Sequence, residues 1–378
     1  MNGEQPTKES SEVFKLTPTD IDHLFKVSGR KGNSLSPFRY DAEKASSSTP
    51  SEAFRALIKN PKFQQIGRRL LEPDLRIEFH NGGGVATDDK YFALLSTNYK
   101  SVLAQFVNSE GDILLILFPD WETLVKWWTG VYASKGMGGY QTVFPNAMGI
   151  EVLVCALNCI DIYRRSYMES MLDYRAGVNL SLTTQDFVSL LKRSLASKDK
   201  RWLLPTMFEI TPGLKNSSIA LKPEHIQQVK ELGFVTSHEE ALTLDERSKI
   251  MGTEFITSWM GSIGCQATAL TNGEERSISK VFMAITSFAN HLVSFETGAN
   301  GETRFRHQAS TAPEIIEKLV KWMEELQKAI SNPAPRTKTE APAKNGNNSA
   351  PKAEFCTQCG TEIRPGKNFC NNCGKAVK

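Results

Sequence analysis

The stretch VLAQFVNSEGDILLILFPDWETLVKWW, residues 102–128, contains two apolar runs, a turn between them and a helical pattern after them. The runs are Val102–Val107 and Ile113–Phe118, and Asn108-Ser109-Glu110-Gly111 separates them. Short apolar runs joined by such residues are typical of antiparallel strands. Pro119-Asp120 then precedes apolar residues with helical spacing, so we expect a helix to begin there.

A second stretch, residues 281–323, repeats this order of strands, turn and helix. Its expected elements are strands in Val281–Phe288, His291–Glu296 and Thr303–His307, a turn at Gly298-Ala299-Asn300-Gly301, and a helix from about Ala312. In the first stretch, Tyr91–Leu95 adds a third strand before Val102. Antiparallel strands followed by a separate helix predict the α+β fold class.

Two further pairs of segments match each other in the same order along the chain. Residues 16–26 and 182–192 both fit L-T-x-x-D-Φ-x-x-L-Φ-K, where Φ is apolar, and Leu124–Trp128 is similar to Leu319–Met323. The threonine and the aspartate three residues later predict a capped helix start in each copy. The pattern therefore predicts two pseudo-symmetric α+β repeats that form one body. Chance similarity between two α+β stretches is the alternative.

These signals divide the chain into six parts. We expect a disordered N-terminus at 1–12, repeat 1 at 13–130, a connecting loop and long helix at 131–178, repeat 2 at 179–330, a disordered linker at 331–353 and a small domain at 354–378. The long helix is expected over Ala147–Arg175. The linker is rich in Pro, Ala, Asn, Lys and Thr and has no aromatic or branched aliphatic residue, so it predicts a flexible tether or a passive spacer, with a span of about 25 Å.

Composition excludes several classes of protein. The 378 residues are 40% hydrophobic and 23% charged, which excludes a wholly disordered, collagen-like or coiled-coil chain. The longest apolar run outside expected helices, Ile113–Phe118, is far shorter than the roughly 20 residues of a membrane span. No secretory signal is visible, and the seven cysteines are an odd number, so a reducing, cytoplasmic location without disulfides is expected.

Four cysteines near the C-terminus have the spacing of a zinc site. Cys356 and Cys359 form one CxxC-Gly, and Cys370 and Cys373 form a second after a ten-residue spacer. Four thiolates match the tetrahedral coordination of structural zinc, and glycine permits the tight turn after each pair. So short a domain cannot bury a sufficient core, whereas zinc contributes about 10–16 kcal/mol of apparent folding free energy. Reactive thiols or a disulfide are the alternatives.

Residues 354–374 resemble the short zinc-ribbon family found at the ends of many bacterial and archaeal proteins. The resemblance rests on the two CxxCG knuckles and on Glu362-Ile363-x-Pro365-Gly366-x-x-Phe369 between them, and Thr357 stands where proline is frequent. It implies one structural Zn²⁺ held by four protein ligands, with no position open for catalysis. The implied ligands are Cys356, Cys359, Cys370 and Cys373.

The tail from residue 331 carries eight basic and three acidic residues, although the whole chain has a net charge of only +3. This excess favours nucleic acid as a partner class. Zinc with four thiolates is itself negative, however, and offsets the positive charge of the ribbon. A nucleic-acid partner is therefore the alternative rather than the main prediction.

The layout of the body resembles the EspG-type chaperones of ESX (type VII) secretion, which are cytosolic proteins of two quasi-symmetric α+β halves. The resemblance rests on the helix that follows Leu16-Thr17, on the passage from helix to strand over Leu70–Phe79, and on the hairpin-then-helix endings at 102–128 and 291–323. It covers about 300 residues and implies a protein that holds a secretion substrate. The zinc ribbon lies outside that family's plan.

Catalytic motifs are not visible in the sequence. Gly82–Gly84 lacks the following helix and lysine of a phosphate-binding loop and predicts a hairpin loop. Gly136–Tyr140 follows a helix rather than a strand and predicts a mobile loop. The scattered histidines give no metal or acid–base motif, and a helix is expected from His238; the six are His23, His80, His225, His238, His291 and His307.

The remaining cysteines and the tryptophans have two interpretations each. Cys155 and Cys159 share a helix face as buried hydrophobes or as a reactive or metal-binding pair, and Cys265 has no evident partner. Trp121, Trp127 and Trp128 fit core packing or an exposed binding anchor.

The main prediction is a non-catalytic, cytoplasmic zinc-binding protein. Its duplicated body binds a protein partner, as an adaptor or a chaperone, and its tethered ribbon makes a second contact. The alternatives are a nucleic-acid-associated regulator that uses the basic tail and an enzyme whose residues are dispersed along the chain.

Overall fold

The computed structural model describes residues 12–81, 90–96, 101–108, 110–211, 214, 219–239, 241–271, 273–297, 303–331, 354–355 and 362–363. The chain divides into two compact units, Met1–Pro333 and Ala334–Lys378, and the first unit is called the body below. Glu12 and Ser331 were expected to be disordered, but Glu12 begins a strand and Ser331 ends a helix. The rest of 1–12 and of 331–353 lies outside the described residues.

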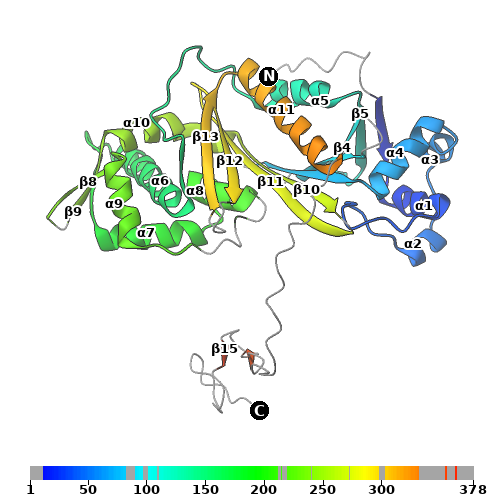
Figure 1. Cartoon of the computed structure of the whole chain (residues 1–378), viewed down its shortest axis with the longest axis horizontal. Coiled ribbons are helices and arrows are strands. Elements are labelled where there is room, and N and C mark those ends of the chain that lie inside the picture. Colours follow the sequence, from blue (N-terminus) through cyan, green and yellow to red (C-terminus); the bar gives the residue numbers. More distant parts are fainter. Residues whose placement is uncertain are drawn as a thin grey trace, which may run out of the picture. The chain divides into compact units, whose positions relative to one another are not determined.

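One long antiparallel sheet organises the body (Figure 1). Its strands, in spatial order, are β1 (Glu12–Leu16), β5 (Ile113–Phe118), β4 (Val102–Val107), β3 (Lys90–Leu95), β2 (Leu75–Asn81), β10 (Ser262–Thr271), β11 (Glu274–Ile285), β12 (Asn290–Thr297), β13 (Thr303–Ser310) and β6 (Ala147–Gly149). All the neighbouring pairs are antiparallel. Together with the helices, this sheet confirms the α+β class.

Two meanders meet at the centre of the sheet. The strands β2 to β5 form one meander, β10 to β13 form the other, and β2 pairs with β10. Each meander leads into a helix, α5 (Trp121–Tyr132) or α11 (Ala312–Ser331). Asp120 caps α5 by accepting a hydrogen bond from the Thr123 backbone N–H at 2.8 Å. The strands and helix starts expected from residues 91–128 and 281–323 are confirmed to within three residues, except that β11 begins at Glu274, seven residues before the expected Val281.

Helices α5 and α11 lie side by side over one face of the sheet (Figure 1). Beneath them, Ile263 and Cys265 of β10 belong to the same apolar cluster as Val281 and Met283 of β11. Trp121 and Trp128 are buried in this cluster, and Trp127 packs against it. The tryptophans therefore form core, as expected from the first of their two interpretations.

The first four helices cover the opposite face of the β2–β5 meander. They are α1 (Pro18–Ser28), α2 (Ala42–Ser47), α3 (Glu52–Leu57) and α4 (Pro61–Leu71). Leu94 and Leu103 contact this helical layer, whereas their neighbours Ala93 and Ala104 belong to the core under α5, because alternate side chains of a strand point to opposite faces.

The middle of the chain covers the opposite face of the second meander. Its elements are α6 (Ile150–Leu172), α7 (Thr184–Ala196), α8 (Leu203–Ile210), α9 (Pro223–Glu231), α10 (Glu246–Glu254), the 3₁₀ helix η1 (Phe255–Met260), and a small sheet of β7 (Ser181–Thr183), β9 (Ala241–Leu244) and β8 (Val235–His238). Two expectations are wrong here. The long helix was expected from Ala147, but Ala147–Gly149 is a strand and α6 begins at Ile150. A helix was expected from His238, but His238 is the last residue of β8, and Glu239 in the following turn has φ of 54°.

The two threonine motifs both cap helices but occupy different places in the fold. Thr17 and Asp20 form a capping box at α1, and Thr183 and Asp186 form one at α7, so the helix starts are confirmed. The strand before α1 is β1, which pairs with β5 in the long sheet, whereas the strand before α7 lies in the small sheet. It is β6 that takes the edge position beside β13. The motif pair therefore does not mark equivalent places in the long sheet.

Candidate functional site

The second unit contains a short hairpin at the expected zinc ribbon. Glu354–Phe355 (β14) pairs antiparallel with Glu362–Ile363 (β15). Cys356 and Cys359 fall in the connection between these strands and, like Cys370 and Cys373, lie outside the described residues. A CxxC pair between two antiparallel strands is the arrangement of a zinc knuckle, so the described backbone fits the metal.

Residues 355–377 match the family model of the zinc-ribbon domain. The matched range includes all four cysteines, so zinc binding by this end of the chain is supported. No curated protein matches the chain. The family match therefore covers the ribbon alone, and the function of the body is argued below from its own residues.

The cysteines of the body are buried. Burial raises the pKa of Cys155 to about 12 and raises those of Cys159 and Cys265 well above the usual range for a thiol. Thiols of this kind stay protonated at neutral pH and are poor nucleophiles. Their packing against apolar side chains agrees with the interpretation of buried hydrophobes.

Within the described residues, no three His, Cys, Asp or Glu side chains come together as a metal site. None of the helices in that part of the chain combines the length and apolar character of a membrane span. Gly82–Gly84 lies outside the described residues. Gly136–Tyr140 has no helix or strand, and Met137 N–H donates to the carbonyl of Phe288, just before β12, at 2.7 Å.

Two of the scattered histidines meet in the interior. His291 of β12 and His307 of β13 lie on one face of the hairpin, and His291 Nδ1 is 2.9 Å from His307 Nε2. The other ring nitrogen of His291, Nε2, is 2.6 Å from Oε1 of Glu254, the last residue of α10. All three side chains are buried. A carboxylate and two imidazoles therefore form a continuous chain of hydrogen bonds.

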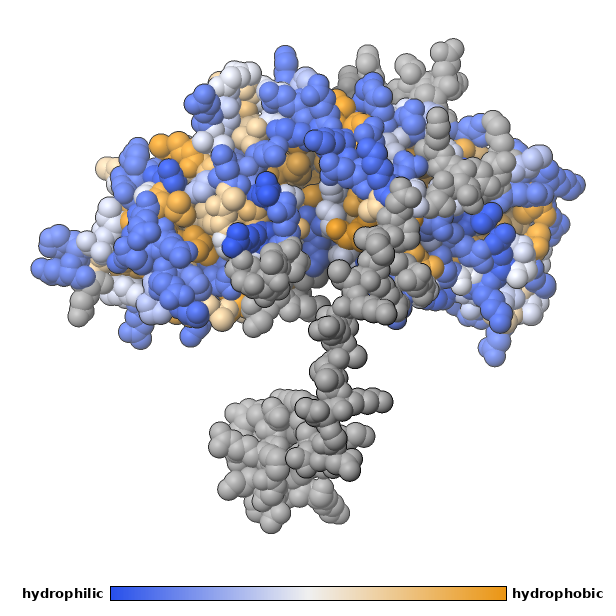
Figure 2. All heavy atoms as spheres, in the orientation of Figure 1, coloured by the Kyte–Doolittle hydropathy of each residue, from blue (hydrophilic) through white to orange (hydrophobic). Residues whose placement is uncertain are grey.

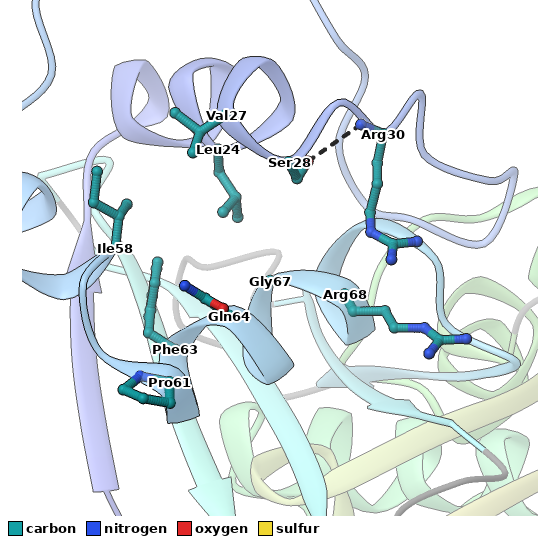
Figure 3. A pocket seen from close by; sticks show the side chains of 10 residues that line it. All are labelled: Leu24, Val27, Ser28, Arg30, Ile58, Pro61, Phe63, Gln64, Gly67 and Arg68. Carbon is teal, nitrogen blue, oxygen red and sulfur yellow. Dashed lines mark hydrogen bonds between the residues drawn. The ribbon is translucent and has the colours of Figure 1, made fainter.

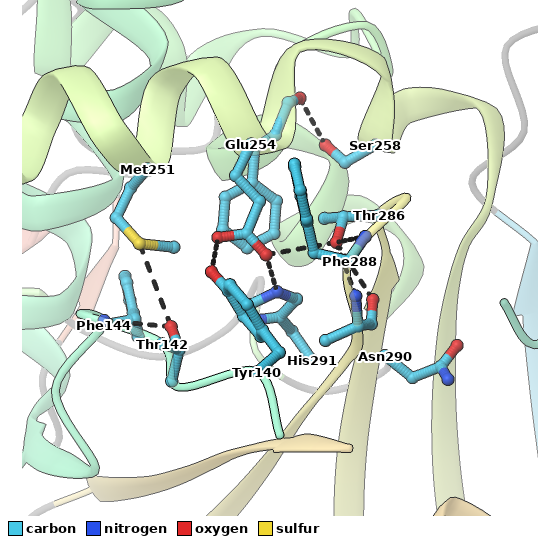
Figure 4. Close-up of polar contacts among 12 residues, drawn as sticks. Tyr140, Thr142, Phe144, Met251, Glu254, Ser258, Thr286, Phe288, Asn290 and His291 are labelled. Atoms are coloured by element: carbon cyan, nitrogen blue, oxygen red, sulfur yellow. Dashed lines mark hydrogen bonds and ion pairs between the residues drawn. The ribbon is translucent and has the colours of Figure 1, made fainter. Parts of the chain in front are cut away.

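Two hydroxyl groups complete the surroundings of the Glu254 carboxylate (Figure 4). Tyr140 donates its phenolic hydrogen to Oε2, and Thr286 lies with Oγ1 3.1 Å from Oε1. Burial alone would raise the pKa of Glu254, but the hydrogen bonds from His291, Tyr140 and Thr286 outweigh it and hold that pKa below its usual value. The carboxylate is therefore ionised in the interior.

The ionised Glu254 carboxylate determines which nitrogen of His291 carries a hydrogen. His291 Nε2 donates to Glu254, so with both rings neutral His291 Nδ1 accepts from His307 Nε2–H. The remaining nitrogen, His307 Nδ1, then carries a lone pair. Burial lowers the pKa of His307 to about 3, and the nearby His291 and Lys318 contribute to this lowering. The ring of His307 is therefore neutral near pH 7. We call Glu254, His291 and His307 the relay.

The sequence held a partial signal for this cluster. His291 and His307 are equally distant from residue 299 in the expected turn, so a simple hairpin places them opposite one another. The observed register pairs His307 with Val293 and His291 with Ala309, which makes the histidines diagonal neighbours on one face. Glu254 has no such signal, because its position depends on how α10 packs. The other four histidines lie elsewhere in the fold.

The relay makes the stability of the body depend on pH. Unfolding frees His307 to take up a proton below about pH 6.5, whereas the folded ring resists protonation until about pH 3. The unfolded state therefore binds more protons in this window, and stability falls as pH drops, by up to about 1.4 kcal/mol per pH unit. The folded state also lowers the pKa of Glu254, so protonation of this carboxylate causes a further loss of stability at the lowest pH values.

Urea unfolding at several pH values between 7 and 4 measures this dependence. We expect His307→Gln to show a shallower slope than the wild-type protein between pH 6.5 and 5, by up to about one proton. Equal slopes in the two proteins would contradict the buried neutral state of His307.

A separate groove lies between α1 and α4 (Figure 3). It has a volume of about 600 Å³, and its lining combines apolar side chains with two arginines and contains no carboxylate; its residues are Leu24, Val27, Ser28, Arg30, Ile58, Pro61, Phe63, Gln64, Gly67 and Arg68. In Figure 3 the two guanidinium groups lie together at one end of the groove. Elsewhere, the face of the body in Figure 2 is mainly hydrophilic, with apolar patches over the α6–α9 region.

Proposed function

We propose that this chain is a non-catalytic, cytoplasmic zinc-binding adaptor. Its body binds a protein partner, and the ribbon, connected through residues 331–353, makes a second contact. The observation that carries the proposal is the zinc-ribbon match at residues 355–377, joined to a large body. Small zinc-stabilised domains of this kind serve mainly as recognition modules, because their closed metal site leaves no position for a substrate.

The zinc ion in this proposal is single and structural. Cys356, Cys359, Cys370 and Cys373 supply four thiolates, which fill tetrahedral coordination. Because the ribbon is too short to fold on apolar burial alone, its shape and its contacts depend on the metal.

The α1–α4 groove is the proposed docking site of the body. Val27 is 62% exposed at its edge, Ile58 is half-buried, and the buried side chains of Leu24 and Phe63 form its floor. A single amphipathic helix or an extended segment fits a groove of this kind. Arg68 is exposed, and Arg30 pairs with Glu72, so the basic end favours an acidic residue on the partner. The proposed partner is therefore an apolar protein segment with an acidic flank.

The strand order supports a duplicated body as part of the same proposal. The long sheet reads β5-β4-β3-β2 on one side of its centre and β10-β11-β12-β13 on the other, with β1 and β6 at the two ends. Two copies of one α+β unit, joined at β2 and β10, would produce this order. A chaperone that holds a secretion substrate, as in the EspG-type proteins, is the specific form of adaptor that we propose for such a body.

Capture of a partner by the full-length protein tests this function. We expect Val27→Asp to reduce capture about tenfold or more, because a charge in the groove must be desolvated on binding. Val131 of α5 is 57% exposed outside the groove, so Val131→Asp is the matched control and should leave capture unchanged. Removal of residues 354–378 should weaken capture without abolishing it.

The outcomes separate the proposal from its alternatives. Equal capture by Val27→Asp and Val131→Asp would contradict the groove as the docking site. Capture that disappears after nuclease treatment would favour the nucleic-acid alternative. A turnover activity abolished by one substitution in the body would contradict the non-catalytic assignment.

A further inference from the structure

A second groove lies on the other side of α1 from the α1–α4 groove. Helix α1 lies between α4 and α2 and contacts both helices (Figure 1). The walls of this groove are α1, residues 38–44 at the start of α2, and the end of the hairpin that β4 and β5 form. Its volume is about 820 Å³, and none of its described lining residues belongs to the α1–α4 groove. We call it the α1–α2 groove.

The α1–α2 groove has an apolar floor and apolar edges. Ile21 of α1 and Ile113 of β5 are buried at its floor, and at its edges Tyr40 is 41% and Val107 is 53% exposed. Val107 pairs with Ile113 in the sheet, so both side chains lie on the face that α1 covers. Exposed apolar side chains that gather around one groove are typical of a protein-binding surface.

The ring of Tyr40 is held in place at the edge of the groove. It packs on Phe25 of α1, with 5.5 Å between the ring centroids. Phe25 lies three residues after Asp22 on α1, so this contact brings the Tyr40 ring to the part of the helix that carries Asp22. A ring that is already ordered loses little conformational entropy on binding, and the face of an aromatic ring attracts a cation.

The charged residues that line the groove leave two carboxylates without a partner. Asp41 caps α2, since its Oδ1 accepts from the backbone N–H groups of Glu43 and Lys44, and Lys44 Nζ lies 3.6 Å from Asp41 Oδ2. The guanidinium of Arg39 donates to backbone carbonyls of the preceding loop. Within the described part of the chain, the carboxylates of Asp22 and Glu43 have no hydrogen bond or ion pair.

The turn between β4 and β5 adds to the negative charge. Gly111 of this turn lines the groove, and a carboxylate stands on each side of it, Glu110 and Asp112. Lys15 of β1 lies with Nζ 2.6 Å from Asp112 and 3.6 Å from Glu110, so it offsets one of these two charges. The groove itself is lined by three carboxylates and two cations, and its surroundings are therefore negative.

We propose that the α1–α2 groove binds an apolar protein segment that carries a lysine or an arginine, with this cation beside Asp22 and Glu43 and against the Tyr40 ring. Charge complementarity favours a basic segment here, whereas the α1–α4 groove, with Arg30 and Arg68, has the opposite preference. The same carboxylates repel the phosphates of a nucleic acid, so the occupant is a protein. The inference is independent of the proposed docking in the α1–α4 groove.

Peptide selection on the full-length protein tests the site. The probe is a phage-displayed library of random peptides, from which binders are synthesised and their Kd values measured. We expect binders in which a lysine or an arginine stands among apolar residues, and replacement of that residue by glutamate should weaken binding about tenfold or more. Selection of acidic or uncharged peptides alone would overturn the proposal.

Two double variants with equal changes in net charge localise the binding. Asp22→Asn with Glu43→Gln should weaken binding of the selected basic peptide about fivefold or more, because both charges that face the cation are lost. Glu324 and Glu325 are exposed on α11, outside the groove, so Glu324→Gln with Glu325→Gln is the matched control and should leave the affinity unchanged. Equal affinity of the two double variants would overturn the proposal.

Two further measurements make the result independent of variant folding and of the proposed function. In the wild-type protein, the basic peptide should shift the amide NMR signals of Tyr40 and Val107 and leave that of Val27 in place. Val27→Asp, which tests the α1–α4 groove, should keep the affinity within about twofold of the wild type. Shifts at Val27 instead, or a large loss of affinity in Val27→Asp, would assign the peptide to the α1–α4 groove and overturn the proposal.

Discussion

Gly264→Ala is expected to destabilise the body by about 3 kcal/mol or more. Gly264 lies in β10, at the centre of the long sheet, and the end of α8 packs directly on it. A Cβ at this position would lie 2.0 Å from the Ile210 carbonyl oxygen and 2.9 Å from the Thr211 nitrogen. Both are backbone atoms, so no side chain can rotate away, and α8 would have to leave the sheet. Urea unfolding of the full-length protein measures the loss.

Gly130→Ala is the matched control for this prediction. Gly130 lies in α5, where an added Cβ would meet no neighbouring group within 4 Å, and alanine is the better helix former by up to about 1 kcal/mol. We expect this variant to unfold at the same or a higher urea concentration than the wild-type protein. A Gly264→Ala protein within about 1 kcal/mol of the wild type would show that α8 does not rest on β10.

The meanders and the helices after them could be predicted because their signals are local. The strands of residues 91–118 are short apolar runs between turn residues, and Thr303–Ser310 alternates buried and exposed positions. Asp120, Thr17 and Thr183 mark helix starts because their side chains cap the first turn. The pairing of β2 with β10 is not local, because the two strands are separated by about 180 residues, and no pattern within either strand specifies the other.

Short elements with weak patterns account for the errors. Ala147–Gly149 reads as the start of a helix, but pairing with Arg304, Phe305 and Arg306 makes it an edge strand. His238 reads as a helix start after Ser237, but β9 pairs with β8 and forces a turn at Glu239. The partner strand is distant in the sequence for Ala147–Gly149 and is the neighbouring strand of a hairpin for His238, and in both cases strand pairing overrides local propensity.

The ribbon could be predicted from local sequence, whereas the relay could not. The ribbon cysteines are four residues of one type within 18 positions, and that spacing predicts a zinc site without any structure. The relay combines Glu254, His291 and His307, with Tyr140 more than 100 residues before Glu254. Only the packing of α10 and of the Tyr140 loop against one hairpin brings these groups together.

Cys370→Ser is expected to unfold the ribbon, as is a serine at any of the other three ligand positions. Loss of one thiolate leaves three ligands, and zinc contributes about 10–16 kcal/mol of apparent folding free energy in domains of this size. We expect the variant to lose its zinc and the ribbon to unfold, while the body unfolds at the same urea concentration as before. The match at residues 355–377 motivates this expectation.

Asn371→Ala is the control, because Asn371 lies inside the same CxxC but supplies no thiolate. It should retain the metal. Equal zinc content in Cys370→Ser and Asn371→Ala would exclude Cys370 as a ligand.

The zinc content of the full-length protein, purified without chelator, tests the central claim most directly. Elemental analysis should find one zinc per chain, which a chelator removes without changing the unfolding transition of the body. Well under one zinc per chain would contradict the ribbon as a metal-dependent recognition module, and with it the proposed function.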